Sequence, residues 1–97
     1  MSTHASASMI AVAIERPGAA EVLVPVTRPR PQPREGEVLI RVAAAGVNRP
    51  DVFQRRGGYP PPAGASDLPG LEIAGTIAAL GAGVGGHAIG DPVTALV

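Results

Sequence analysis

The stretch that decides the fold is AAAGVNRPDVFQRRGGYPPPAGASDLPGLEIAGTI, residues 43–77 of the 97-residue chain. Its first half carries the signals of one short helix. Asn48 is a favourable N-cap residue, Pro50 and Asp51 suit a first helical turn, and Gly57 suits a helix end. The pattern therefore predicts a helix over residues 48–57, followed by a loop through the Gly- and Pro-rich residues 58–64.

Outward from this helix, short runs rich in β-branched residues predict five strands. They are Met9–Ile14, Glu21–Thr27, Glu37–Val42 with its continuation to Ala45, Leu71–Leu80 interrupted at Gly75, and Val93–Val97. Pro25 cannot donate a ladder hydrogen bond, which places its strand at a sheet edge. The Pro-rich residues 28–34 favour an extended surface connector over a recognition ligand. This inventory predicts an all-β fold, and a barrel is favoured because closure removes unprotected edges.

Composition excludes several classes of protein. Eight basic and eight acidic residues give a net charge of zero, which argues against a generic nucleic-acid or anionic-membrane binder. The chain has no Cys, so disulfides and thiolate metal sites are impossible. No apolar run approaches the ~20 residues of a membrane span. Residues 1–8 lack the apolar middle of a signal peptide and are expected to form a disordered tail, and we expect a cytoplasmic protein.

Gly81, Gly83 and Gly86 follow a predicted strand in the spacing G-x-G-x-x-G. A dinucleotide-binding motif of this kind must open a helix whose N-terminus faces the pyrophosphate. Here Gly90-Asp91-Pro92 follows too soon for a helix to form. We therefore interpret the motif as a hairpin turn.

The stretch quoted above, with GEVLIRV (residues 36–42), GLEIAG (70–75) and GDPVTAL (90–96), resembles the zinc-free quinone oxidoreductases of the medium-chain dehydrogenase/reductase superfamily. The similarity is strongest to the zeta-crystallin-like and p53-inducible branch, and it covers residues 9–97. It implies a GroES-like, partly open β-barrel with one short helix. It also implies that residues 9–97 are the N-terminal, substrate-side domain, truncated before the Rossmann domain that binds NADPH.

The same resemblance bears on metal binding. Zinc alcohol dehydrogenases of the superfamily have a Cys where Asn48 stands and a His where Leu71 stands. An Asn amide is a poor zinc ligand and a Leu side chain is none, so no zinc site is expected. Glu72 matches an acidic position of the family, but one carboxylate does not make a site.

Two residues are candidates for binding. Asn48 can donate and accept hydrogen bonds to a substrate oxygen or to the cofactor, although it also suits a helix cap. Tyr59 matches a pocket-lining tyrosine of the family, and its ring can stack on a quinone. A core-filling role for Tyr59 is the alternative, but its position on a Gly/Pro-rich loop argues against it.

Other polar residues are expected to have structural roles. We expect Asp51 to cap the helix or to form an ion pair, and Arg55 and Arg56 to be solvated charges at the helix end. The role of Glu72 stays open. His4 and His87 lack the partners of a catalytic triad.

The expected function is that of the parent enzyme, which transfers hydride from NADPH to a quinone or enone without zinc, whereas this chain alone would be inactive. The alternative is a stand-alone GroES-like interaction module without enzymatic activity. Because a cut barrel would expose apolar surface, we expect a homo-oligomer, for example a dimer formed by edge pairing.

Overall fold

The computed structural model describes residues 8–97, and these form two compact units. The first unit comprises residues 8–30 and 47–71, and the second comprises residues 31–46 and 72–97. The predicted tail, residues 1–8, lies outside the described residues except for Ser8, which begins the first strand.

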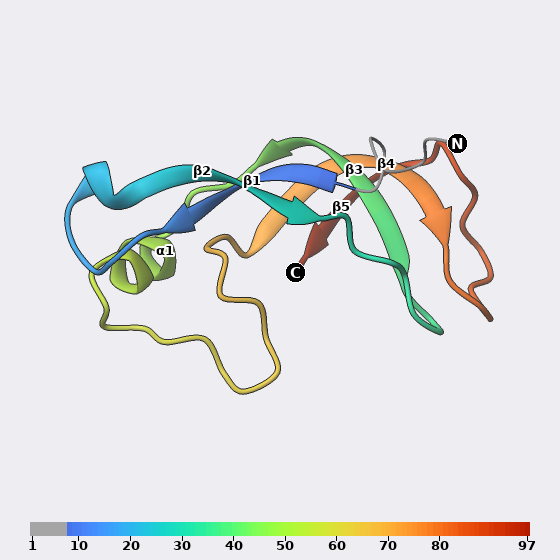
Figure 1. Ribbon diagram of the computed structural model, residues 1–97. Helices are drawn as coiled ribbons and strands as arrows, with labels where there is room; N and C mark the ends of the chain where they lie inside the picture. The colour runs from blue at the N-terminus through green and yellow to red at the C-terminus, as the bar shows by residue number, and fades with distance from the viewer. Residues whose placement is uncertain (1–7) are drawn as a thin grey trace. The chain divides into compact units, whose positions relative to one another are not determined.

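The first unit contains a two-stranded antiparallel sheet (Figure 1). Strand β1 (Ser8–Ile14) pairs with β2 (Leu23–Pro29) without a break in register. A 3-10 turn, η2 (Ala20–Val22), leads into β2, and Val22 is buried with only 1% of its surface exposed. Both strands are edges of this sheet, as predicted for the strand that contains Pro25.

The predicted helix is confirmed as α1 (Arg49–Arg55). It packs beside the turn that follows β1 through two hydrogen bonds. The Arg55 Nε–H donates to the Gly18 carbonyl over 3.0 Å, and the Gly18 N–H donates to the Arg55 carbonyl over 3.0 Å. Arg55 is therefore a part-buried anchor and not the solvated charge that was expected.

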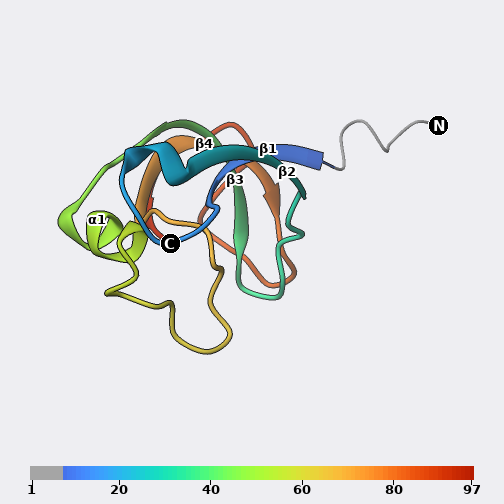
Figure 2. The same ribbon diagram turned by 60° about the vertical axis from the view of Figure 1, so that its left-hand side comes forward.

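The second unit contains a three-stranded antiparallel sheet with the order β3-β4-β5. Its strands are β3 (Val38–Ala45), β4 (Glu72–Leu80) and β5 (Pro92–Leu96). The β3–β4 register shifts at Leu39/Ile40 and again at Val42/Ala44. Bulges bend a strand and increase its twist, and both strands curve strongly along their length (Figures 1 and 2). Ile77 of β4 is the buried residue of this unit, with 2% exposed.

Gly75 was predicted to interrupt this strand, but β4 continues through it. It is paired on both sides, with Val42 of β3 and with Val93 of β5. A Cβ atom at Gly75 would overlap the Arg41 carbonyl oxygen. The glycine therefore permits a close approach of β3 at the second register shift, where the extra residue, Ala43, lies in β3.

The glycine motif after β4 forms a connection between antiparallel neighbours, as the hairpin interpretation predicts. Residues 81–91 contain turns and no helix. The hairpin is closed at its base, where the Ile77 N–H donates to the Asp91 carbonyl over 3.0 Å and the Gly90 N–H donates to the Ile77 carbonyl over 2.8 Å.

The mainly β architecture with one short helix is confirmed. Across residues 8–97 the strands form two open sheets and not a closed barrel, which agrees with the partly open form. The closed barrel that was favoured in order to remove unprotected strand edges is therefore not formed within these residues. No helix within this range is long and apolar enough to cross a membrane.

Candidate functional site

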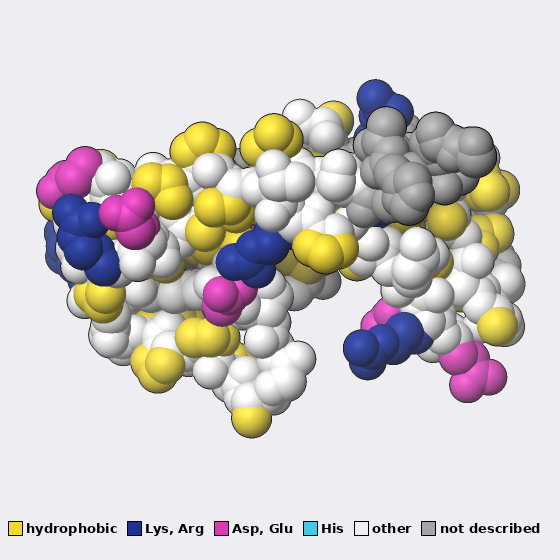
Figure 3. Space-filling view, viewed as in Figure 1, with side chains coloured by type: hydrophobic (Ala, Val, Ile, Leu, Met, Phe, Trp, Pro, Cys, Tyr) yellow, Lys and Arg dark blue, Asp and Glu magenta, His cyan; other side chains and the backbone are white. Residues whose placement is uncertain are grey.

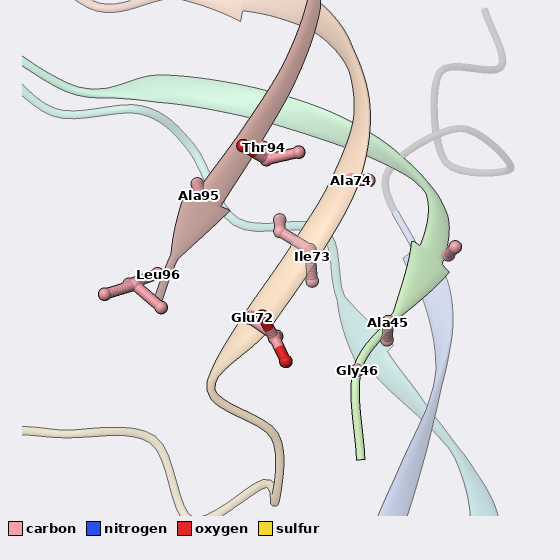
Figure 4. Close-up of a pocket in the computed structure, with 9 residues that line it drawn as sticks. Ala45, Gly46, Glu72, Ile73, Ala74, Thr94, Ala95 and Leu96 are labelled. Atoms are coloured by element: carbon pink, nitrogen blue, oxygen red, sulfur yellow. The ribbon is translucent and has the colours of Figure 1, made fainter. Parts of the chain in front are cut away.

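An open pocket of about 530 Å³ lies in the second unit, where β3 ends and β4 begins. Figure 4 shows its lining side chains on the three neighbouring strands. They are mostly small and apolar: Ala44, Ala45, Gly46, Glu72, Ile73, Ala74, Thr94, Ala95 and Leu96. A volume of several hundred cubic ångströms is typical of sites for small organic ligands.

The end of the β3–β4 ladder shapes this pocket. Ala45 pairs with Ile73, and the Gly46 N–H then donates to the Glu72 carbonyl oxygen over 3.1 Å. The Glu72 side chain lies against the Gly46 backbone, so a Cβ atom at position 46 would overlap its carboxylate. The glycine is therefore the residue that allows the Glu72 carboxylate to occupy this place (Figure 4).

The lining defines what the pocket can bind. Alanine side chains from all three strands leave room for a planar apolar group. Glu72 is the ionisable side chain of the lining, and Thr94 contributes a hydroxyl that can donate and accept. A ligand with an apolar body and one or two polar atoms would match this distribution.

Asn48 lies in the first unit, at the N-cap of α1. Its backbone N–H donates to Asp51 Oδ2 over 2.9 Å, and the Asp51 N–H donates to the Asn48 carbonyl over 3.0 Å. The two residues form a capping box. The capping interpretation of Asn48 and the structural interpretation of Asp51 are thus confirmed. Asp51 Oδ1 is buried and accepts no hydrogen bond within residues 8–97.

Tyr59 also lies in the first unit, in residues 56–71, which contain no regular secondary structure. Its side chain is 44% exposed, so it does not fill a core. The loop is attached through Asp67. Its carboxylate accepts from Arg28 of β2 at 3.2 and 3.5 Å, and its carbonyl accepts from Gln54 Nε2 at 3.1 Å.

Charge at this attachment perturbs one acid. The Arg28 guanidinium donates hydrogen bonds to the Asp67 carboxylate and also attracts its negative charge, so the pKa of Asp67 lies below its ordinary value of 3.8.

Elsewhere, acidic and basic side chains also lie together in small groups on the face shown in Figure 3. This intermixing fits the net charge of zero.

The sequence-predicted candidates do not line the pocket. Asn48 and Tyr59 belong to the first unit and the pocket belongs to the second. Glu72, whose role was open, lines it. Residues such as Ala44, Ala74 and Thr94 were missed, because small residues in strands look like ordinary packing. The one available signal in the sequence was Gly46, which directly follows the predicted strand end at Ala45.

No group of three or more His, Cys, Asp or Glu residues that could hold a metal ion occurs in the described part of the chain. His87 is exposed in the β4–β5 connection, and Arg56 is exposed after α1. His4 lies outside the described residues.

Comparison with protein families gives a match to the alcohol dehydrogenase GroES-like domain over residues 34–96. The human synaptic vesicle membrane protein VAT-1 homolog-like is 43% identical over 67 residues, which are 69% of this chain and 16% of that protein. A quinone oxidoreductase of Lama guanicoe is 43% identical over 63 residues, which are 65% of this chain and 19% of that enzyme. The chain therefore spans less than a fifth of the length of these relatives.

Solved structures show the same fold. The human VAT-1 homolog-like protein superposes with a TM-score of 0.84 at 38% identity, over 93% of this chain and 29% of that one. A mycobacterial protein complexed with NADPH gives 0.74 at 39% identity, over 89% and 27%. A cobalt- and zinc-bound thermostable alcohol dehydrogenase from Pyrobaculum aerophilum gives 0.78 at 41% identity, over 90% and 26%.

Proposed function

Since the chain belongs to the alcohol dehydrogenase GroES-like domain family, we propose that it is the N-terminal, substrate-side domain of an NADPH-dependent quinone oxidoreductase. The observation that carries this proposal is the 43% identity to a quinone oxidoreductase over 65% of the chain. NADPH use is supported by the structural relative that was solved with NADPH. The reaction would be hydride transfer to a quinone or another conjugated carbonyl.

The donor set supports zinc-independent chemistry. Tetrahedral zinc needs Cys, His or carboxylate ligands, and Asn48 and Leu71 stand where the resemblance places the Cys and His of the zinc enzymes. Glu72 alone cannot supply the set, so these residues do not fit a catalytic zinc ion. One relative was solved with cobalt and zinc bound. We expect this chain to differ from that relative by binding no zinc.

Without a metal, the domain would contribute by positioning the acceptor and by donating hydrogen bonds to it. NADPH supplies the hydride when it is bound, and a quinone is electrophilic enough that neutral donors near its oxygen suffice. We assign to the Asn48 side-chain NH2 group a hydrogen bond donated to the acceptor or to the cofactor, because the side-chain oxygen serves the capping box. To Tyr59 we assign stacking on the acceptor ring, which its 44% exposure permits.

The test uses the protein encoded by the complete reading frame, with NADPH oxidation measured against a series of quinones. Tyr59→Ala should lower kcat/KM by about tenfold, which corresponds to one aromatic contact and one hydrogen bond. Phe53→Ala is the matched control, because Phe53 is 46% exposed on α1. Unchanged kinetics in Tyr59→Ala would overturn the assignment. The 97-residue chain alone should oxidise no NADPH.

We also propose that the chain self-associates into a homodimer. β5 lies at an edge of its sheet, and Leu96 is 85% exposed on it. Exposed apolar edges favour pairing with another strand. Sedimentation velocity over a range of concentrations should show a dimer, which Leu96→Lys should weaken. A monomer at every concentration would contradict this proposal.

A further inference from the structure

The loop of residues 56–71, which we call the Tyr59 loop, is hydrogen-bonded to regular structure near its far end through Asp67. Residues 56–67 are exposed. Within the loop, a turn is closed by the Ala65 N–H, which donates to the Pro62 carbonyl over 3.0 Å. At its start, the Gly58 N–H donates to the Phe53 carbonyl over 2.8 Å, so the loop leaves α1 in a fixed direction.

Three hydrogen bonds converge on Asp67. Two come from the Arg28 guanidinium to the two carboxylate oxygens, at 3.2 and 3.5 Å. The third comes from Gln54 Nε2 to the Asp67 carbonyl, at 3.1 Å. Asp67 therefore connects the loop to a strand and to a helix at the same point.

The two residues that hold Asp67, Arg28 and Gln54, both lie in regular secondary structure. Arg28 is paired with Met9 in the β1–β2 ladder, and Gln54 lies in the last turn of α1. The fork-shaped guanidinium matches a carboxylate with two parallel hydrogen bonds, which gives orientation as well as attraction. The geometry of this pair can therefore define the position of the loop.

The same pair is weak enough to open. The Arg28 side chain is 36% exposed and the Asp67 side chain is 69% exposed, so water and salt compete for both. The Arg28–Asp67 ion pair therefore fixes the orientation of the loop but contributes little free energy. A contact that opens reversibly needs both properties.

We propose that Arg28 and Asp67 are positioning residues that latch the Tyr59 loop, so that release of this ion pair frees Tyr59. The latch itself depends only on contacts within the first unit. Its consequence for catalysis rests on the proposed function, in which Tyr59 contacts the acceptor.

The chain offers a specific probe, because Tyr59 is its one tyrosine and it has no tryptophan. Intrinsic fluorescence anisotropy and acrylamide quenching therefore report on this loop. Asp67→Asn and Arg28→Gln should each lower the anisotropy and raise the quenching constant, with the open population increasing about two- to fivefold. The double variant should resemble either single variant, because one interaction is removed in all three.

The matched control is Glu35→Gln, which removes an exposed acidic charge in the other unit and should leave Tyr59 fluorescence unchanged. Circular dichroism verifies that each variant is folded. Wild-type protein in rising salt is a second measurement that needs no variant, and quenching should increase as the Debye length falls from about 10 Å to about 3 Å. Fluorescence that responds neither to salt nor to the substitutions would overturn the latch.

Kinetics of the complete protein separate the two proposals. If both hold, Asp67→Asn raises the KM for quinone severalfold with little change in kcat, and Asp67→Glu restores part of the loss. If fluorescence shows release of Tyr59 but the KM for quinone is unchanged, the latch stands and the assignment of Tyr59 to the acceptor is wrong.

Discussion

At the scale of single residues, Gly46 leaves room for the Glu72 side chain in the pocket. A Cβ atom there would overlap the Glu72 carboxylate. Gly46→Ala should therefore displace that side chain, and because Glu72 is exposed and flexible, the free energy of unfolding should fall by only about 0.5–1 kcal/mol. Urea denaturation followed by circular dichroism measures this change.

Gly85→Ala is the control for this prediction, because a Cβ atom at Gly85 meets nothing within 4 Å. It should be neutral or stabilising by up to about 1 kcal/mol, since alanine restricts the unfolded chain. In a Glu72→Ala background the cost of Gly46→Ala should shrink. An equal cost in both backgrounds would show that overlap with Glu72 is not the cause.

A second residue-scale prediction concerns pH. Hydrogen bonds and attraction from Arg28 hold the pKa of Asp67 below 3.8. Asp67 in the unfolded chain titrates near its ordinary value, so its contribution to stability is fully present above that value and is lost as pH falls through the lower folded pKa. The difference in urea midpoint between wild type and Asp67→Asn should therefore shrink toward zero in that acidic window. A difference independent of pH would contradict this linkage.

At the scale of elements, α1 depends on its N-terminal cap. Asp51 Oδ2 accepts the Asn48 N–H over 2.9 Å, and Asp51→Ala removes this bond. The change should cost about 0.5–2 kcal/mol of unfolding free energy. Glu35→Gln again controls for loss of a carboxylate, and amide hydrogen exchange in residues 49–55 should rise only in Asp51→Ala. Unaltered exchange in that variant would mean that the cap does not hold the helix.

The elements were predictable wherever a local signal decides them. The helix could be placed from Asn48 and Gly57, because capping and helix termination depend on adjacent residues. The strand interruption predicted at Gly75 was wrong, since the need for glycine there arises from Arg41 on another strand. The pocket joins three strands that lie between positions 44 and 96, and the Arg28–Asp67 pair joins residues 39 positions apart. No pattern within one segment could reveal either of them.

At the scale of the whole molecule, the family resemblance and the donor chemistry point to different metal contents. The chain is 41% identical to an alcohol dehydrogenase that was solved with cobalt and zinc bound, yet Asn48 and Leu71 offer neither thiolate nor imidazole. The absence of Cys from all 97 residues removes the strongest zinc ligand altogether. The side chains at positions 48 and 71 should decide whether zinc binds, because overall sequence identity does not supply metal ligands.

Isothermal titration of the chain with zinc should accordingly show no tight, stoichiometric binding. Weak heats from the two histidines are identified by repeating the titration with His4→Ala/His87→Ala. The variant Asn48→Cys/Leu71→His restores the two donor types that the resemblance assigns to zinc enzymes, and it should bind zinc more tightly than wild type. A tight one-to-one isotherm for the wild-type chain would mean that other side chains hold the metal, and zinc-independent hydride transfer would no longer follow from the residues at positions 48 and 71.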